Sequence, residues 1–120
     1  MEEKNKQLEL FPYTFNDYQK DCLKTAVYPK EYKVMYPSLG LAGESGEVCD
    51  KVKKIYRDDN GIVSDEKKKE LAKEIGDCLW YCAALCSDLG ISLETVAHLN
   101  REKLQSRMKR DMIHGSGDNR

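Results

Sequence analysis

The sequence has no long apolar run and almost no net charge. No stretch approaches the roughly 20 consecutive apolar residues that a membrane-spanning helix needs. The 20 basic and 21 acidic residues give a formal net charge of −1, which excludes a globally basic nucleic-acid-binding protein. The N-terminal segment MEEKNKQLEL is polar and acidic and contains no apolar signal-peptide core. We therefore expect a cytoplasmic protein with neither a nucleic-acid polymer nor a membrane as partner.

The sequence also lacks a paired cysteine framework, strand patterns and histidine clusters. Five is an odd number of cysteines, and with no export signal it argues against a disulfide scaffold. Beta-branched residues are sparse and never alternate over a useful length, so no strand is predicted. His98 and His114 have no partner at a metal-ligand spacing, and we assign neither a role. The 120 residues fit a single domain.

Apolar residues at helical spacing predict four helices joined by short connections. The expected helices are 15–27, 39–57, 65–89 and 93–112. Their expected N-caps are Thr14, Ser38, Ser64 and Ser92. The expected interruptions are a turn at Asn60-Gly61 and a stop at Gly90.

The pattern predicts an all-α, four-helix bundle-like domain over residues 14–112, completed by oligomerisation. An N-terminal arm, 1–13, and a C-terminal tail, 113–120, flank this domain. Oligomerisation is expected because Trp80, Ala83 and Ala84 lie on the side of the third helix away from its main apolar arc.

One acidic motif occurs twice, as LAGESGE at 41–47 and LAKEIGD at 71–77. Glu44 and Glu47 are i,i+3 neighbours on one helix face, and so are Glu74 and Asp77. Each pair borders an apolar arc that is expected to face the core. The arcs are Leu41, Val48, Val52 and Tyr56 in one helix, and Leu71, Ile75, Cys78, Cys82 and Cys86 in the other. Packing of the two arcs would bring four carboxylates to one place.

Such a cluster needs neutralisation, because two like charges about 5 Å apart repel by about 3 kcal/mol at an effective dielectric of about 20. Protonation, basic neighbours or a metal ion would each supply it. Carboxylate oxygens without His or Cys partners favour magnesium, manganese or calcium over zinc. A glycine beside each acidic pair, Gly46 and Gly76, suggests close approach by another helix or a ligand.

Two other interpretations of the repeated acidic motif are weaker. A single Glu-x-x-Glu on a lysine-rich helix usually belongs to a solvated face with ion pairs, but two matched motifs at core edges argue against a solvated face. Helical di-iron sites use Glu-x-x-His pairs, and neither motif has the histidine. The stripe Cys78, Cys82 and Cys86 is interpreted as small apolar core residues rather than soft-metal ligands.

The wider context of the acids resembles the MazG-like nucleoside triphosphate pyrophosphohydrolases. The resemblance is carried by YPSLGLAGESGEVCDKVKK (36–54) and KKELAKEIGDCLWYCAALCSDLGISLETVAHLNREKLQSR (68–107), and it covers about residues 14–110. It implies the hydrolysis of a nucleoside triphosphate to the monophosphate and pyrophosphate. It also implies that Glu44, Glu47, Glu74 and Asp77 hold magnesium, with manganese as an alternative. Among these acids, Glu47 is our choice to orient or deprotonate the attacking water.

The resemblance further implies which residues contact the substrate. Asn100 and Lys103 of NREK, and Lys54 of the first basic pair, would contact the triphosphate. Gln19 and Tyr28 are base readers by resemblance alone. Tyr81 lies one turn beyond Asp77 and is placed to contact the nucleoside. Arg107 shares one arc of the fourth helix with Asn100 and Lys103, either as a phosphate contact or as part of a solvated basic stripe.

Three functions are compatible with these residues. The first is a pyrophosphohydrolase that controls or cleans nucleotide pools, assembled as a homodimer or homotetramer. The second is a non-catalytic helical module that binds nucleotide or another protein on the same scaffold. The third is a carboxylate-metal hydrolase that acts on other diphosphates. The tail GSGDNR has a composition typical of disorder, but we expect it to fold over a triphosphate site through Arg120 or its glycine-flanked amides.

Overall fold

A computed structural model describes residues 12–120, and within that range the chain contains four α-helices, one 3₁₀ turn and no strand. The helices are α2 (Phe15–Leu23), α3 (Met35–Asp58), α4 (Asp65–Asp88) and α5 (Leu93–Lys109), with η1 (Lys30–Tyr32) between α2 and α3. The predicted all-α class is therefore confirmed. Almost all of the predicted N-terminal arm, 1–13, lies outside the described residues. No helix in 12–120 combines the length and apolarity that crossing a membrane demands.

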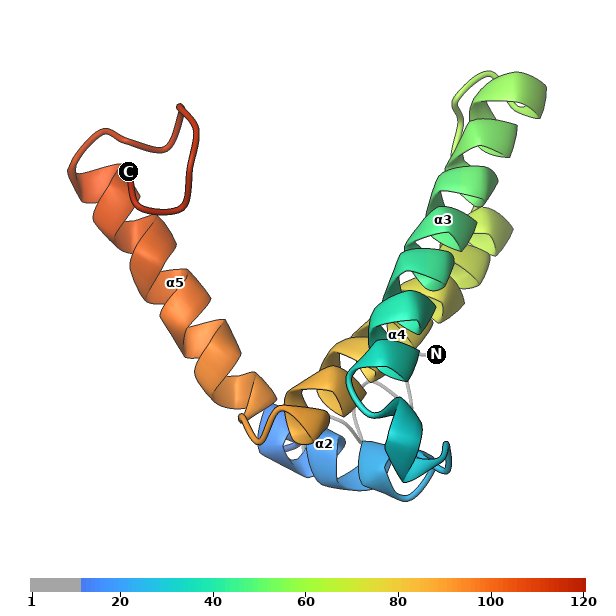
Figure 1. The fold of residues 1–120 in the computed structure, drawn as a ribbon. Helices are drawn as coiled ribbons and strands as arrows, with labels where there is room; N and C mark the ends of the chain where they lie inside the picture. The colour runs from blue at the N-terminus through green and yellow to red at the C-terminus, as the bar shows by residue number, and fades with distance from the viewer. Residues whose placement is uncertain (1–11) are drawn as a thin grey trace.

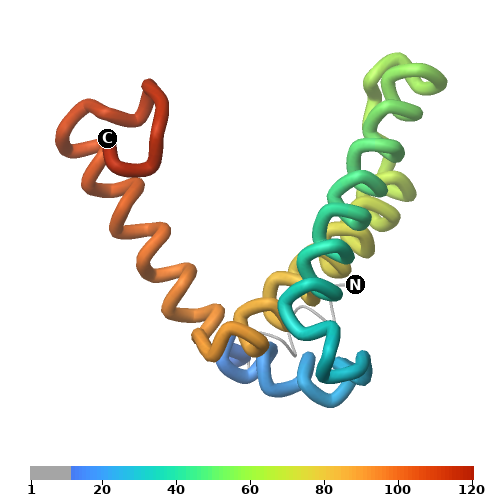
Figure 2. The backbone as a smooth tube through the Cα atoms, viewed as in Figure 1, coloured from blue at the N-terminus to red at the C-terminus, as the bar shows by residue number. Residues whose placement is uncertain are grey.

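The longest helices, α3 and α4, form an antiparallel hairpin, and α2 packs across the end of it (Figure 1). The turn between them takes positive φ at Asn60 (54°) and Gly61 (76°), as the Asn-Gly pair predicts. Helix α5 leaves the far end of α4 and diverges from the hairpin, so that the backbone has the outline of a V (Figure 2). The radius of gyration is 17.3 Å, against about 13–14 Å for a compact chain of this length.

Three of the four predicted N-caps are confirmed. Thr14 forms a capping box with Asp17, while the hydroxyls of Ser64 and Ser92 accept from the N–H groups of Lys67 and Thr95. Gly90 adopts φ of 70° directly after the C-cap of α4, where the sequence predicts the helix to stop. The first and last helices end at 23 and 109, earlier than the predicted 27 and 112. The last one stops because Asp111 adopts φ of 56° and the chain turns back on itself.

The predicted cap at Ser38 is wrong, because α3 begins at Met35 and Ser38 lies inside its first turn. The Ser38 hydroxyl donates to the carbonyl of Val34 at 2.6 Å instead of capping. Val34 has φ of 68°, a rare conformation for a β-branched residue. Asp88 holds this start in place, since its carboxylate accepts from the Val34 N–H at 2.9 Å and from the Tyr28 hydroxyl at 2.7 Å.

A small core lies where α2, α4 and α5 meet. It consists of Cys22, Ala83, Cys86 and Leu93, with Tyr18, Leu79, Trp80 and Cys82 packed around it. The expectation that Ala83 and Ala84 face outward is wrong, because they are 0% and 1% exposed and Ala83 packs in this core with Cys22 of α2. Conversely, Ile75 and Tyr56 of the predicted core arcs are 57% and 70% exposed. The cysteine stripe is apolar packing as predicted, and burial raises the pKa of the Cys82 and Cys86 thiols.

Candidate functional site

Three of the four predicted metal-binding acids come together where α3 faces α4. Glu44 comes from α3, and Glu74 and Asp77 come from α4. One carboxylate oxygen from each residue lies within 4.8 Å of the others, which is a separation that a single cation can bridge. The antiparallel hairpin produces this convergence, because motifs at similar distances from the turn lie side by side. The contact of Ser45 Oγ with Cys78 Sγ at 3.9 Å marks the same level of the hairpin.

Glu47 is the fourth predicted acid, and it does not belong to the converged group. It is exposed on α3, one turn beyond Glu44. Its charge still reaches the cluster, because it is one of the groups that raise the pKa of Glu44. Glu47 therefore lies outside the converged group but near enough for its charge to act on Glu44.

The electrostatics of the cluster show mutual repulsion with little compensation. Partial burial, the charge of Asp77 and hydrogen bonding to Glu74 raise the pKa of Glu44 above its ordinary value. Among the described residues, the ion pair to this group comes from Lys51, whose Nζ lies 3.7 Å from Glu74 Oε1. The three side chains of the group each offer a carboxylate oxygen, and such a donor set fits a hard divalent cation such as magnesium or manganese.

A pocket of about 370 Å³ adjoins the acids and is lined by Thr25, Glu44, Asp77, Trp80 and Tyr81. Two of its residues, Thr25 and Trp80, were not predicted as site residues. The Trp80 indole donates to Thr25 Oγ1 at 2.8 Å, and its ring meets Tyr81 edge-on with centroids 5.1 Å apart. One wall is thus aromatic and the other acidic, and the volume is large enough for part of a nucleotide.

A missed glycine, Gly40, allows Tyr81 to take this place. A Cβ atom at position 40 would lie 2.1 Å from Cε1 of the Tyr81 ring, so the ring lies directly against the α3 backbone. By contrast, a Cβ atom at Gly46 or Gly76 would meet nothing within 4 Å. The prediction that another helix of this chain approaches Gly46 and Gly76 closely is therefore wrong, because neither glycine lies at a close helix contact.

Two residues that the family resemblance suggests as base readers, Gln19 and Tyr28, link helices in the structure. The Gln19 amide donates to Ser87 Oγ and the Ile91 carbonyl, both at 3.0 Å, and accepts from the Leu93 N–H at 2.9 Å. Tyr28 donates its hydroxyl to Asp88 and stacks on Tyr36 with centroids 4.6 Å apart. These contacts use the polar groups of both residues to hold α2 and the connector against α4.

The predicted phosphate contacts lie apart from the acids in a single chain. Lys54 pairs with Asp50 at 2.8 Å, and this lysine together with Lys53 lowers the pKa of Asp50 to about 2. It is Lys51, one turn earlier, that reaches the cluster. Asn100 and Lys103 lie on α5, which diverges from the hairpin (Figure 1), and Arg107 of the same helix is buried under the C-terminal loop.

The fold and site define a class: a helical protein with a cluster of three carboxylates next to an aromatic pocket. The model of the MazG nucleotide pyrophosphohydrolase domain matches residues 37–111. The chain belongs to this family, as its motifs predict. It is similar to the Gene 37 protein of Mycobacterium phage L5, with 44% identity over 109 residues that cover 86% of this chain and 96% of that protein. No solved structure matches it.

Glu44→Gln tests whether the cluster is a cation site. At neutral pH the raised pKa of Glu44 means that its charge disfavours the folded state, so the metal-free variant should melt at the same or a higher temperature. Magnesium at about 100 times its Kd should raise the wild-type Tm by roughly 5–10 °C, and this rise should be absent in the variant. Differential scanning calorimetry with EDTA or magnesium measures both effects.

The matched control is Glu31→Gln, which removes an exposed carboxylate from η1. It should keep the full response to magnesium. An equal loss in both variants, or a full response in Glu44→Gln, would remove Glu44 from the cation site.

Proposed function

We propose that the protein is a magnesium-dependent pyrophosphohydrolase that converts a nucleoside or deoxynucleoside triphosphate to the monophosphate and pyrophosphate. The convergence of Glu44, Glu74 and Asp77 beside an aromatic pocket carries this proposal. The domain family of the chain supports the same reaction class. The cellular role would be control or cleaning of the nucleotide pool.

The acidic residues of the chain would have different roles in this reaction. Glu44, Glu74 and Asp77 would hold the metal, and Glu47 would complete the set from the exposed edge. A magnesium ion there would neutralise phosphate oxygens and make a bound water more acidic. Glu47 is the acid with most freedom to orient that water or accept its proton, because it lies outside the converged group. In this reaction the water oxygen would bond to the α-phosphorus, the bond from that phosphorus to the oxygen bridging it to the β-phosphorus would break, and pyrophosphate would leave with that oxygen.

The pocket would receive the nucleoside. Tyr81 and Trp80 offer aromatic surface to a base or sugar, and Thr25 lies beside them with its hydroxyl already bonded to the indole. The Tyr81 ring packs against the α3 backbone at Gly40, and this contact fixes the position of the ring. Gln19 and Tyr28 would act indirectly, by holding α2 and the connector around this pocket.

A second copy of the chain would complete the site, in a homodimer or homotetramer. Large apolar side chains remain exposed along α5, including Leu99 (59%), Leu104 (45%) and Met108 (65%). The same helix carries Asn100, Lys103 and Arg107, while the acids lie on the other arm of the V. Burial of the α5 face on the hairpin of a second copy would bring phosphate-binding cations to the acids and cover the apolar residues at once.

The products of hydrolysis show which bond is broken, and they test the proposed function. With magnesium and a panel of canonical and modified nucleoside triphosphates, we expect monophosphate and pyrophosphate as products, identified by anion-exchange chromatography. Asp77→Asn should lower turnover by at least about 100-fold, because it removes a converged ligand. Asp59→Asn, at the hairpin tip, is the control and should keep turnover. Diphosphate and phosphate as products would contradict the proposed bond, and no turnover by folded protein would favour a non-catalytic binding module.

The mass in solution tests the assembly. Light scattering after size-exclusion chromatography should give two or four times the chain mass of 13.8 kDa. Leu104→Glu should shift the protein toward monomer, since it places a charge on the apolar α5 face. Gln105→Glu adds the same charge at the next position, about 100° around the helix, and should leave the mass unchanged. A monomeric wild type at micromolar concentration would rule out the shared site.

A further inference from the structure

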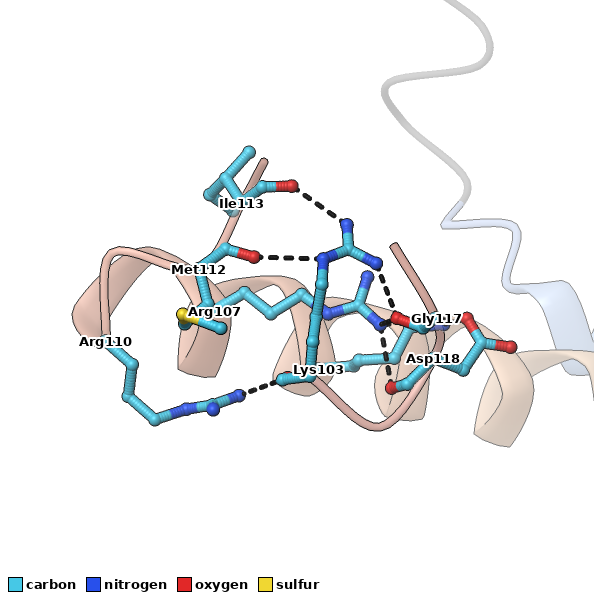
Figure 3. Close-up of polar contacts among 8 residues, drawn as sticks. Lys103, Arg107, Arg110, Met112, Ile113, Gly117 and Asp118 are labelled. Carbon is cyan, nitrogen blue, oxygen red and sulfur yellow. Dashed lines mark hydrogen bonds and ion pairs between the residues drawn. The ribbon is translucent and has the colours of Figure 1, made fainter. Parts of the chain in front are cut away.

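Most ion pairs between the described residues join neighbours within one turn of the chain. At the C-terminus, Arg107 of α5 approaches Asp118 of the loop that folds back onto this helix, and Arg120 closes the loop by donating to three of its carbonyls (Figure 3). The pair of Lys51 and Glu74 differs from all of these, because it joins α3 to α4. It therefore links the two helices that carry the acids.

The place of Lys51 on α3 keeps its side chain near the acid cluster. Glu44 and Glu47 precede it by seven and four residues, so the three side chains leave one face of the helix. The Lys51 Nζ lies 3.7 Å from Glu74 Oε1, which is an ion-pair distance but too long for a charge-assisted hydrogen bond. The two side chains are 29% and 18% exposed. The pair is thus partly shielded from solvent, and no hydrogen bond holds it.

Lys51 relieves part of the repulsion within the cluster. Among the described residues, no other lysine or arginine forms an ion pair with Glu44, Glu74 or Asp77. A positive charge beside three carboxylates lowers the electrostatic cost of keeping them together, and partial burial weakens the screening of that attraction. The hairpin without metal is therefore more stable with this ammonium group than without it.

A divalent cation and the Lys51 ammonium compete for the same negative charge. A cation bound by Glu74 would lie next to an ammonium that pairs with the same carboxylate, and two positive charges at such short range repel. The cation therefore displaces the ammonium from Glu74 when it binds. Lys51 can leave without any movement of α3, because its flexible four-carbon stem lets the ammonium rotate into solvent.

We propose that Lys51 is a built-in counter-ion of the acid cluster, which holds the empty site together and lowers its affinity for a divalent cation. The inference rests on the cation site of the proposed function and adds a residue that regulates how readily this site fills. In the metal-free chain Lys51 pairs with Glu74, and in the loaded chain it is released. Its charge thus raises the cation concentration that is needed to occupy the site.

This role predicts effects of opposite sign on stability and on metal affinity. Loss of a lysine that only stabilises the hairpin would lower the Tm and leave metal affinity unchanged. Loss of a group that helps to hold the metal would weaken metal binding. Loss of a counter-ion destabilises the empty site and removes its competitor, so the metal-free Tm falls while the affinity for metal rises.

Manganese titration of the full chain without nucleotide, followed by the EPR signal of the free ion, measures the affinity. Lys51→Met should bind manganese about three- to tenfold more tightly than the wild type, as expected when a partly shielded ion pair no longer competes. Lys51→Arg keeps the charge and should bind it no more tightly than the wild type. The matched control is Lys53→Met, which removes a lysine of the same helix that pairs with Asp50 at 3.0 Å, and its Kd should stay within about twofold.

Thermal unfolding by calorimetry supplies the second measurement. In EDTA, Lys51→Met should melt about 2–5 °C below the wild type, because the acids have lost their counter-ion. Saturating manganese should reduce or abolish this difference. Lys53→Met should stay within about 2 °C of the wild type in both conditions, since its ion pair is exposed.

The outcomes separate this inference from the proposed function. If wild type and Lys51→Met both bind manganese and the variant binds it equally or more weakly, the counter-ion role is overturned and the cation site stands. Equal tightening in Lys51→Met and Lys53→Met would reveal a general charge effect and overturn the role as well. The predicted tightening in a chain that hydrolyses no nucleoside triphosphate supports the counter-ion and refutes the proposed function. No manganese binding by any variant refutes both.

Discussion

Three carboxylates from two antiparallel helices lie within bridging distance of one another, and their repulsion is the constraint on which the site depends. Lys51 offsets the charge of Glu74 only partly, across 3.7 Å. Hydrophobic packing and the Asn60-Gly61 turn hold α3 against α4 in spite of this repulsion. The fold therefore maintains a local concentration of negative charge that a hard divalent cation would relieve.

The converged acids and the predicted phosphate contacts of α5 lie on different arms of the V. The hairpin arm carries the acids and the aromatic pocket, and the α5 arm carries Lys103 and Arg107. A triphosphate needs both kinds of group, since metal-bound carboxylates and direct cations neutralise different oxygens. In the proposed assembly, the exposed apolar residues of α5 would join the arms of two chains. Within one chain, Arg107 is buried.

Local sequence patterns predicted the features that depend on neighbouring residues. The caps at Thr14, Ser64 and Ser92, the stop at Gly90 and the i,i+3 acids all follow from short-range geometry. The features that were missed depend on contacts between distant segments. Asp88 shapes the start of α3 from 54 residues away, and Tyr81 needs Gly40 on another helix. Likewise, no periodicity in α5 indicates that a loop ten residues further on buries Arg107.

The central claim is that the three converged acids bind a divalent cation, and paramagnetic relaxation measures this most directly. Substoichiometric manganese, added to isotopically labelled protein, broadens the amide resonances nearest the bound ion. The account predicts that resonances around residues 43–48 and 73–78 disappear first and that excess magnesium restores them. Broadening centred on other acidic residues, such as Asp58 and Asp65 at the hairpin tip, or uniform broadening over the chain, would contradict it.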